Sequence, residues 1–217
     1  MNTNKNAKRI LCYGDSNTWG WVPSSMGKQR FDTSIRFPSL LQKKLKKEYE
    51  VIEEGLGART TSFDDPRPEF PERNGLTILP IILETHLPLD YVILMLGTTD
   101  TKPLINKTPE EIGEGIRSLI KVIKQHRVLD NTKSPKILLI VPPIVNEKAE
   151  FASTLFKGGE EKGKALVNIY KIISEEENIL YLDPTSKVKV DKSEGVHLDK
   201  SAHKKLAKMI AEKIREE

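Results

Sequence analysis

Short apolar runs alternate along the chain with longer segments whose apolar residues recur three and four positions apart. The runs, which are typical of strands, span residues 9–13, 49–52, 91–96, 137–141 and 179–182. The segments with helical spacing span residues 34–48, 109–125, 162–174 and 201–214. Apolar strands that alternate with helices are typical of a parallel sheet covered on both faces. The sequence therefore predicts an α/β fold, a three-layer α/β/α sandwich of flavodoxin-like type with a parallel five-stranded sheet.

The alternation is interrupted once, at residues 59–80, which are rich in proline, arginine and aspartate. We expect a long loop there, and a loop of that length inside a compact domain is often functional. No repeat or linker divides the 217 residues, a length typical of one domain. We therefore expect a single domain over residues 1–217.

Composition excludes several classes of protein. With 37% hydrophobic and 30% charged residues, the chain reads as a globular protein, and no apolar run approaches the roughly 18 residues that span a bilayer. The N-terminal apolar stretch is too short for a signal peptide, so we expect a cytoplasmic protein without a membrane partner. The lone Cys12 lies in an apolar run and is expected to be a buried thiol.

Charge and motif content argue against nucleic acids, metals and nucleotide cofactors. The net charge is +4, but the lysines share helices with glutamates, as in residues 42–48, which favours solvated helix faces over a nucleic-acid site. The four histidines are scattered without metal-ligand spacing. The GLG at 55–57 lacks the third glycine of a dinucleotide fingerprint. We expect no metal and no cofactor.

The strongest candidate for chemistry is Ser16, in the run YGDSNTWGW at the end of the first predicted strand. Open α/β sheets bind ligands beyond the carboxyl ends of their strands, where this serine would lie. A serine nucleophile needs a nearby base and donors for an oxyanion. Taken alone, a serine at this position is also a common helix cap.

Four segments resemble, in order, the blocks of the GDSL or SGNH hydrolase superfamily. They are GDS at 14–16, EEGLGARTT at 53–61, GTTD at 97–100 and EGVH at 194–197. The longer runs at 14–23, 53–61 and 86–90 resemble the arylesterase and acyltransferase branch in particular. That resemblance implies hydrolysis of small esters, acyl transfer to alcohols and assembly into a homo-oligomer.

The resemblance also implies roles for particular residues. Ser16 would be the nucleophile, His197 the general base and Glu194 the acid that orients it, although Asp191 in the same loop is an alternative. Only Glu194 keeps the family's three-residue spacing to the histidine, and the family usually has aspartate there. The oxyanion donors would be the N–H groups of Ser16 and Ala58 and the side chain of Thr99, where the family usually has asparagine.

Other residues are candidates for lining the substrate pocket. The same resemblance implies that Trp21 forms a wall of a narrow acyl pocket and that Phe151 and Phe156 line the alcohol side of the cleft. Val196 would also contact substrate. Lys102 would lie at the mouth. Each has a structural alternative: core packing for the tryptophan, oligomer packing for the phenylalanines and simple solvation for the lysine.

The remaining titratable residues near these motifs receive structural interpretations. Asp15 is expected to fix the turn before the serine through backbone hydrogen bonds, and Asp100 to cap the turn that follows its own strand. His86, His126 and His203 are expected at the surface or at helix starts.

The sequence thus predicts a serine esterase that hydrolyses short-chain acetyl or aryl esters through an acyl-enzyme, with acyl transfer to alcohols as a related activity. Its partner would be a small-molecule ester. A carbohydrate acetylesterase or thioesterase with the same triad is an alternative. So is a weakly active ligand-binding relative, because Thr99 and Glu194 depart from the family pattern.

Overall fold

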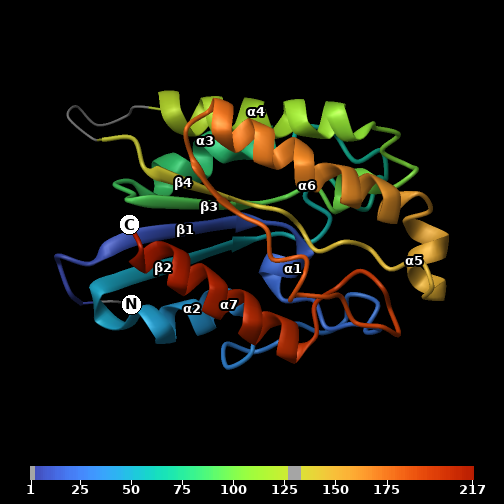
Figure 1. Ribbon diagram of the computed structural model, residues 1–217, viewed down its shortest axis with the longest axis horizontal. Coiled ribbons are helices and arrows are strands. Elements are labelled where there is room, and N and C mark those ends of the chain that lie inside the picture. Colours follow the sequence, from blue (N-terminus) through green and yellow to red (C-terminus); the bar gives the residue numbers. More distant parts are fainter. Residues whose placement is uncertain (1–2, 127–132) are drawn as a thin grey trace.

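The computed structural model describes residues 3–126 and 133–217, which fold around one parallel sheet (Figure 1). The strands lie in the order β2-β1-β3-β4-β5. Their bounds are β1 Lys8–Gly14, β2 Tyr49–Gly55, β3 Tyr91–Met95, β4 Lys136–Ile140 and β5 Leu180–Leu182. The chain runs from β1 to one neighbour and then crosses to the other, so the strand order reverses at β1 and β3. Such a switch point opens a crevice at the carboxyl ends of these strands.

Helices cover both faces of the sheet, which confirms the predicted three-layer α/β/α fold. The helices α2 (Phe37–Leu45) and α7 (Lys200–Arg215) cover one face, as Figure 1 shows. The opposite face carries α3 (Gly75–His86), α4 (Pro109–Gln125) and α6 (Gly159–Glu176).

The side chains of strand β1 pack into two hydrophobic cores, one on each face of the sheet. Ile10 and Cys12 pack toward α2 and α7, whereas Leu11 and Tyr13 pack toward α3, α4 and α6. Alternate side chains of a strand point to opposite faces, so a strand buried on both faces must be apolar throughout. Burial raises the pKa of the Cys12 thiol, as expected of an inert core cysteine.

The helix α3 was not predicted, because its sequence lacks the usual signals of a helix. Residues 76–83 are nearly all apolar, so they lack the polar face that marks an amphipathic helix. Pro80 lies inside it, where a proline normally argues against helix. Its start is nevertheless marked, since the Asn74 side chain accepts hydrogen bonds from the N–H groups of residues 76 and 77. The expected loop therefore ends at residue 74.

Short elements complete the edge of the sheet where the strands end. They are α1 (Ser16–Trp19), η2 (Thr99–Thr101) and α5 (Glu150–Leu155), while η1 (Lys46–Glu48) lies between α2 and β2. The predicted start of α4 matches its cap: Thr108 and Glu111 exchange hydrogen bonds between side chain and backbone.

His203 was expected at the surface or at a helix start, and it lies in the first turn of α7 but not at the surface. Its side chain is completely buried between the rings of Phe31 and Phe37, and its Nδ1 accepts a hydrogen bond from the Phe37 N–H. Burial lowers the pKa of His203 to about 4. The imidazole therefore serves as a neutral core residue on the buried face of α7.

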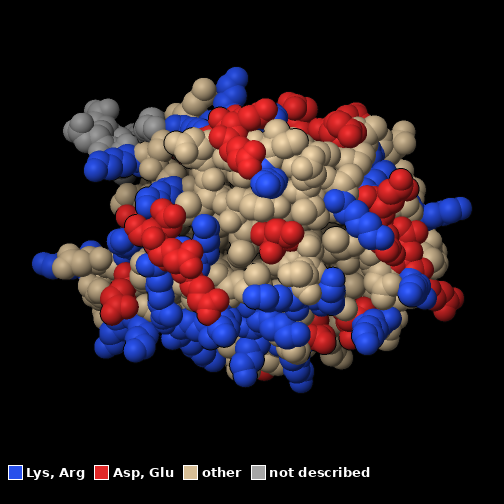
Figure 2. Space-filling model, viewed as in Figure 1, with Lys and Arg blue, Asp and Glu red and all other residues tan. Residues whose placement is uncertain are grey.

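Charges are less evenly mixed over the surface than the sequence suggested. On the face of the molecule drawn in Figure 2, Lys and Arg gather along the lower part, over α2 and α7, and acidic side chains gather along the upper edge. The lysines at 43, 44, 200 and 204 line one shallow depression there. In the described part of the chain, no helix is long and apolar enough to cross a membrane.

Candidate active site

Ser16 begins the short helix α1, immediately beyond the end of β1. The Asp15 carboxylate caps this turn by accepting a hydrogen bond from the Asn17 N–H at 2.9 Å. Gly14 leaves no space for a side chain, since an added Cβ would lie 2.0 Å from the hydroxyl of Thr18. The turn is therefore tight, and it holds Ser16 at the switch point of the sheet.

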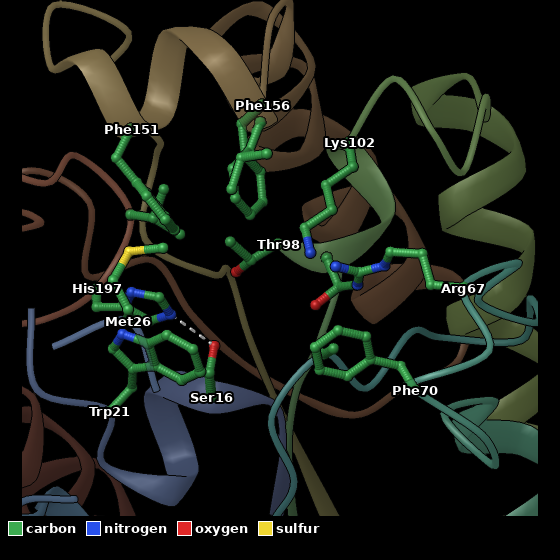
Figure 3. A pocket seen from close by; sticks show the side chains of 14 residues that line it. Ser16, Trp21, Met26, Arg67, Phe70, Thr98, Lys102, Phe151, Phe156 and His197 are labelled. Carbon is green, nitrogen blue, oxygen red and sulfur yellow. Dashed lines mark hydrogen bonds between the residues drawn. The ribbon is translucent and has the colours of Figure 1, made fainter. Parts of the chain in front are cut away.

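His197 reaches Ser16 from a segment 181 residues later in the sequence. Its Nε2 lies 2.9 Å from Ser16 Oγ, and both side chains are buried (Figure 3). Asn17 fixes this approach, because its side-chain oxygen accepts a hydrogen bond from the Leu198 N–H at 2.9 Å. The residues that flank the serine and the histidine are thus bonded directly to each other.

Glu194 contacts the other nitrogen of the imidazole. Its Oε1 lies 2.5 Å from His197 Nδ1, while Oε2 accepts hydrogen bonds from the N–H groups of Val196 and His197 at 3.0 and 2.8 Å. With both oxygens occupied and 2% of the residue exposed, the carboxylate has one orientation. It extends the Ser16–His197 pair into a hydrogen-bonded series of three side chains.

Asp191 takes a different part in this loop. Its carboxylate accepts hydrogen bonds from the Ser193 hydroxyl and from the N–H groups of Ser193 and Glu194. These bonds, chiefly that of the Ser193 hydroxyl, lower the pKa of Asp191. No contact joins its carboxylate to the imidazole, so Asp191 shapes the turn that presents Glu194.

Three segments of the chain, including the one that carries Ser16, meet where an oxyanion would form. Ala58 follows β2 in the left-handed conformation, with φ at 63°, and Thr99 begins η2 after β3. Both line the same cavity as Ser16. The side chain of Arg59 donates to the carbonyl of Gly14 at 2.9 Å and to that of Glu54, which ties the Ala58 segment to β1.

Asp100 connects two of these segments, which differs from the expected turn cap. Its Oδ1 accepts hydrogen bonds from the N–H and hydroxyl of Thr61 at 2.9 and 2.6 Å. It thereby ties η2 to the loop that carries Ala58. Burial raises the pKa of Asp100 to about 6, although the bonds from Thr61 oppose that rise. Asp100 is thus a positioning residue beneath the cavity.

The cavity beside Ser16 has a volume of about 200 Å³ and a largely apolar lining (Figure 3). Trp21 stacks on the His197 ring, with centroids 4.7 Å apart and planes 13° apart. The centroid of the Phe151 ring lies 6.4 Å from that of His197, and the two ring planes are tilted by 46°. Phe156 and Val196 complete the set of apolar residues singled out from the sequence, and all four line the cavity.

Lys102 also lines the cavity, where it stands over an aromatic ring. Its Nζ lies 5.0 Å from the centroid of Phe156. Burial lowers the pKa of Lys102 to about 8, and the nearby Arg67 adds to that effect. Lys102 is therefore half-buried in the cavity that Ser16 also lines, instead of being solvated at the surface.

The comparisons with known proteins agree with this geometry. Residues 12–205 match the profile of the GDSL-like lipase/acylhydrolase family. The chain belongs to this family. Among curated proteins, none matches it significantly.

Solved structures of the GDSL-like family resemble the chain along almost its entire length. An aryl esterase of M. smegmatis is 38% identical, with a TM-score of 0.89, over 97% of this chain and 99% of that one. Est24, a carbohydrate acetylesterase from Sinorhizobium meliloti, is 36% identical, with a TM-score of 0.91, over 96% and 99%. A lipase/acylhydrolase from Enterococcus faecalis is 19% identical, with a TM-score of 0.68 over 96% of each chain, and shows the shared fold.

Five residues of the GDSL-like site were not found from the sequence. They line the cavity together with the residues named above: Met26, Arg67, Phe70, Thr98 and Leu155. Arg67 and Phe70 come from the 59–80 segment, whose unusual length and composition did point to a function. Met26 and Leu155 have no motif to mark them. In the described part of the chain, no three His, Cys, Asp or Glu residues are grouped as a metal site would require.

Proposed function

We propose that this chain is a serine esterase that hydrolyses short-chain carboxylic esters through an acyl-enzyme on Ser16. The observation that carries the proposal is the hydrogen-bonded series Ser16–His197–Glu194 at the edge of a small apolar cavity. A serine with a buried base, an oriented acid and backbone donors is equipped for acyl transfer.

In the acylation step, Ser16 Oγ forms a bond to the ester carbonyl carbon while its proton moves to His197 Nε2. Glu194 accepts a hydrogen bond from Nδ1–H and stabilises the imidazolium. The carbonyl electron pair becomes an oxyanion, to which the N–H groups of Ser16 and Ala58 and the Thr99 hydroxyl would donate. The carbon–oxygen bond to the alcohol then breaks, and Nε2–H protonates the departing oxygen.

In the deacylation step, His197 Nε2 takes a proton from water while the water oxygen attacks the acyl carbon. The bond between the acyl carbon and Ser16 Oγ then breaks, Nε2–H returns its proton to Oγ, and the carboxylic acid departs. If an alcohol replaces this water, the same steps transfer the acyl group to it. The cavity volume of about 200 Å³ and the Trp21 wall favour small acyl groups. Acetyl esters of phenols and small alcohols are the substrates that fit this description best.

The similarity to Est24 supports acetylated carbohydrates as an alternative substrate class, because that protein is described as a carbohydrate acetylesterase. Acyl transfer to alcohols, a homo-oligomeric state and a cytoplasmic location complete the proposal. The first is measured as ester formation from added ethanol, and the second by light scattering of the purified protein.

Labelling with a serine-directed fluorophosphonate tests the proposal directly. We expect stoichiometric labelling of the wild type and a burst of p-nitrophenol from p-nitrophenyl acetate, both lost in Ser16→Ala. Ser153→Ala is the matched control, since Ser153 is an exposed α5 serine bonded only within its own helix. An unlabelled wild type, or a Ser16→Ala variant that retains the burst, would contradict the assignment.

A further inference from the structure

The charged residues that line the cavity are all cationic. Among its 14 lining residues are Lys102 and Arg67, and none is an aspartate or glutamate. Figure 3 shows both side chains extending their nitrogens toward the same central space, across from His197 and Trp21. An ester bound to Ser16 would therefore meet an aromatic wall on one side and positive charge on the other.

Lys102 has no ion-pair partner among the residues that the structure describes. Its ammonium group lies over the face of the Phe156 ring, which stabilises a cation only modestly. A half-buried ammonium loses part of its hydration, and an anion beside it would offset that loss. The lowered pKa of Lys102 reflects this incomplete solvation.

Arg67 is held rigidly beside it. Asp65 accepts hydrogen bonds from its Nε and Nη2 at 2.8 and 2.5 Å, and the Asp65 side chain itself is fully covered. The guanidinium also lies 4.0 Å over the Phe70 ring. Its Nη1 makes no hydrogen bond to any described residue and stays available as a donor. A fixed guanidinium loses little entropy when it binds an anion.

Resting on the proposed esterase function, we propose that the preferred substrate is an ester that carries a carboxylate, which Lys102 and Arg67 bind. The two cations would supply one donor to each carboxylate oxygen. Three carboxylates interact electrostatically with Lys102, but none takes the place of a substrate carboxylate in the cavity. Asp65 is bonded to Arg67, while Asp15 and Asp100 are buried beneath the cavity. The carboxylate belongs either to the acyl part or to the leaving alcohol.

Two pairs of esters distinguish these sources, each pair differing only by carboxylate against carboxamide. Ethyl hydrogen succinate and ethyl succinamate place the group on the acyl part, while 4-acetoxybenzoate and 4-acetoxybenzamide place it on the alcohol. The measured quantity is the ratio of kcat/KM for the carboxylate to that for the carboxamide. His197 and Ser16 act on both members of a pair, so the ratio isolates the binding of the charge.

We expect Lys102→Met to lower this ratio about tenfold in one of the two pairs, in keeping with a charge-assisted hydrogen bond. Lys102→Arg should restore most of it, and the exposed Lys157→Met, which lies outside the cavity, should leave it unchanged. The wild-type ratio should also fall as the pH rises through about 8, where Lys102 loses its proton and Arg67 does not.

A ratio that changes less than twofold in Lys102→Met for both pairs would overturn the proposal, as would an equal change in Lys157→Met. The esterase assignment is judged separately, with p-nitrophenyl acetate and fluorophosphonate labelling of the same samples. A protein that passes those tests but shows no dependence on Lys102 is an esterase without this preference. A protein that fails them has neither property.

Discussion

Replacing Glu194 with glutamine should change which ring nitrogen of His197 carries the proton. Glu194 Oε2 accepts hydrogen bonds from two backbone N–H groups, and Oε1 meets His197 Nδ1 at 2.5 Å. A glutamine has a single acceptor oxygen, which the two N–H groups would retain. Its NH₂ would then face Nδ1 and donate to it, so the neutral imidazole would carry its proton on Nε2.

That tautomer cannot act as the base, because Nε2 must accept the proton of Ser16. The corresponding loss in a serine protease triad is about ten-thousand-fold in kcat, and we expect a decrease of that order for Glu194→Gln. Asp191→Asn should cost less than about threefold, since the Asp191 side chain bonds only Ser193 and Glu194 in its own turn. Glu194→Asp, which shortens the acid by one methylene, should retain more activity than Glu194→Gln.

The assay is steady-state hydrolysis of p-nitrophenyl acetate, combined with the rate of fluorophosphonate labelling. Circular dichroism and thermal unfolding establish that each variant is folded. If Asp191→Asn lost more activity than Glu194→Gln while both remained folded, the proposed role of Glu194 would be refuted.

Three further predictions concern the oxyanion site and the core. Thr99→Asn should raise kcat about tenfold, because an amide reaches further than a hydroxyl and loss of one such donor typically costs about a hundred- to a thousand-fold; an unchanged kcat would contradict this and would mean that the Thr99 hydroxyl already donates as well as an amide. Arg59→Met should lower both kcat and the thermal midpoint, since it removes the hydrogen bonds to the carbonyls of Gly14 and Glu54; full activity would mean that this tie is dispensable. His203 is buried and neutral with a pKa of about 4, so its stabilising contribution is complete above pH 6.5 and is lost as the pH falls toward 4. His203→Leu should therefore reduce the fall in unfolding free energy between pH 7 and pH 4.5 by about 2 kcal/mol, measured by urea titration, and an equal fall in both proteins would contradict this.

The strands were predictable because a parallel sheet covered on both faces needs continuous apolar runs, and β1 and β3 carry them. Strand β2 was predicted to end at residue 52, yet it continues to Gly55. Its last residues are acidic, and Glu53 is held there by Arg36 and Ser39. These partners lie at the start of α2 and at the residue that caps it, so a pattern read along β2 alone does not reveal them.

Candidate residues with a motif could be named from the sequence, whereas those without one could not. Ser16 and His197 lie in short segments with a recognisable order, although their distance apart is visible only in the folded chain. Met26 and Leu155 reach the cavity through loop and helix geometry that no local pattern records. Asp100 was placed in the correct segment, but its partner Thr61 lies 39 residues away in sequence.

The separation of Ser16 and His197 by 181 positions has a consequence for biosynthesis. A ribosome adds Ser16 181 residues before His197, so a growing chain cannot use the proposed pair to hydrolyse esters until the segment that carries His197 has emerged and packed. Esterase activity in a translation extract would thus report completion of folding.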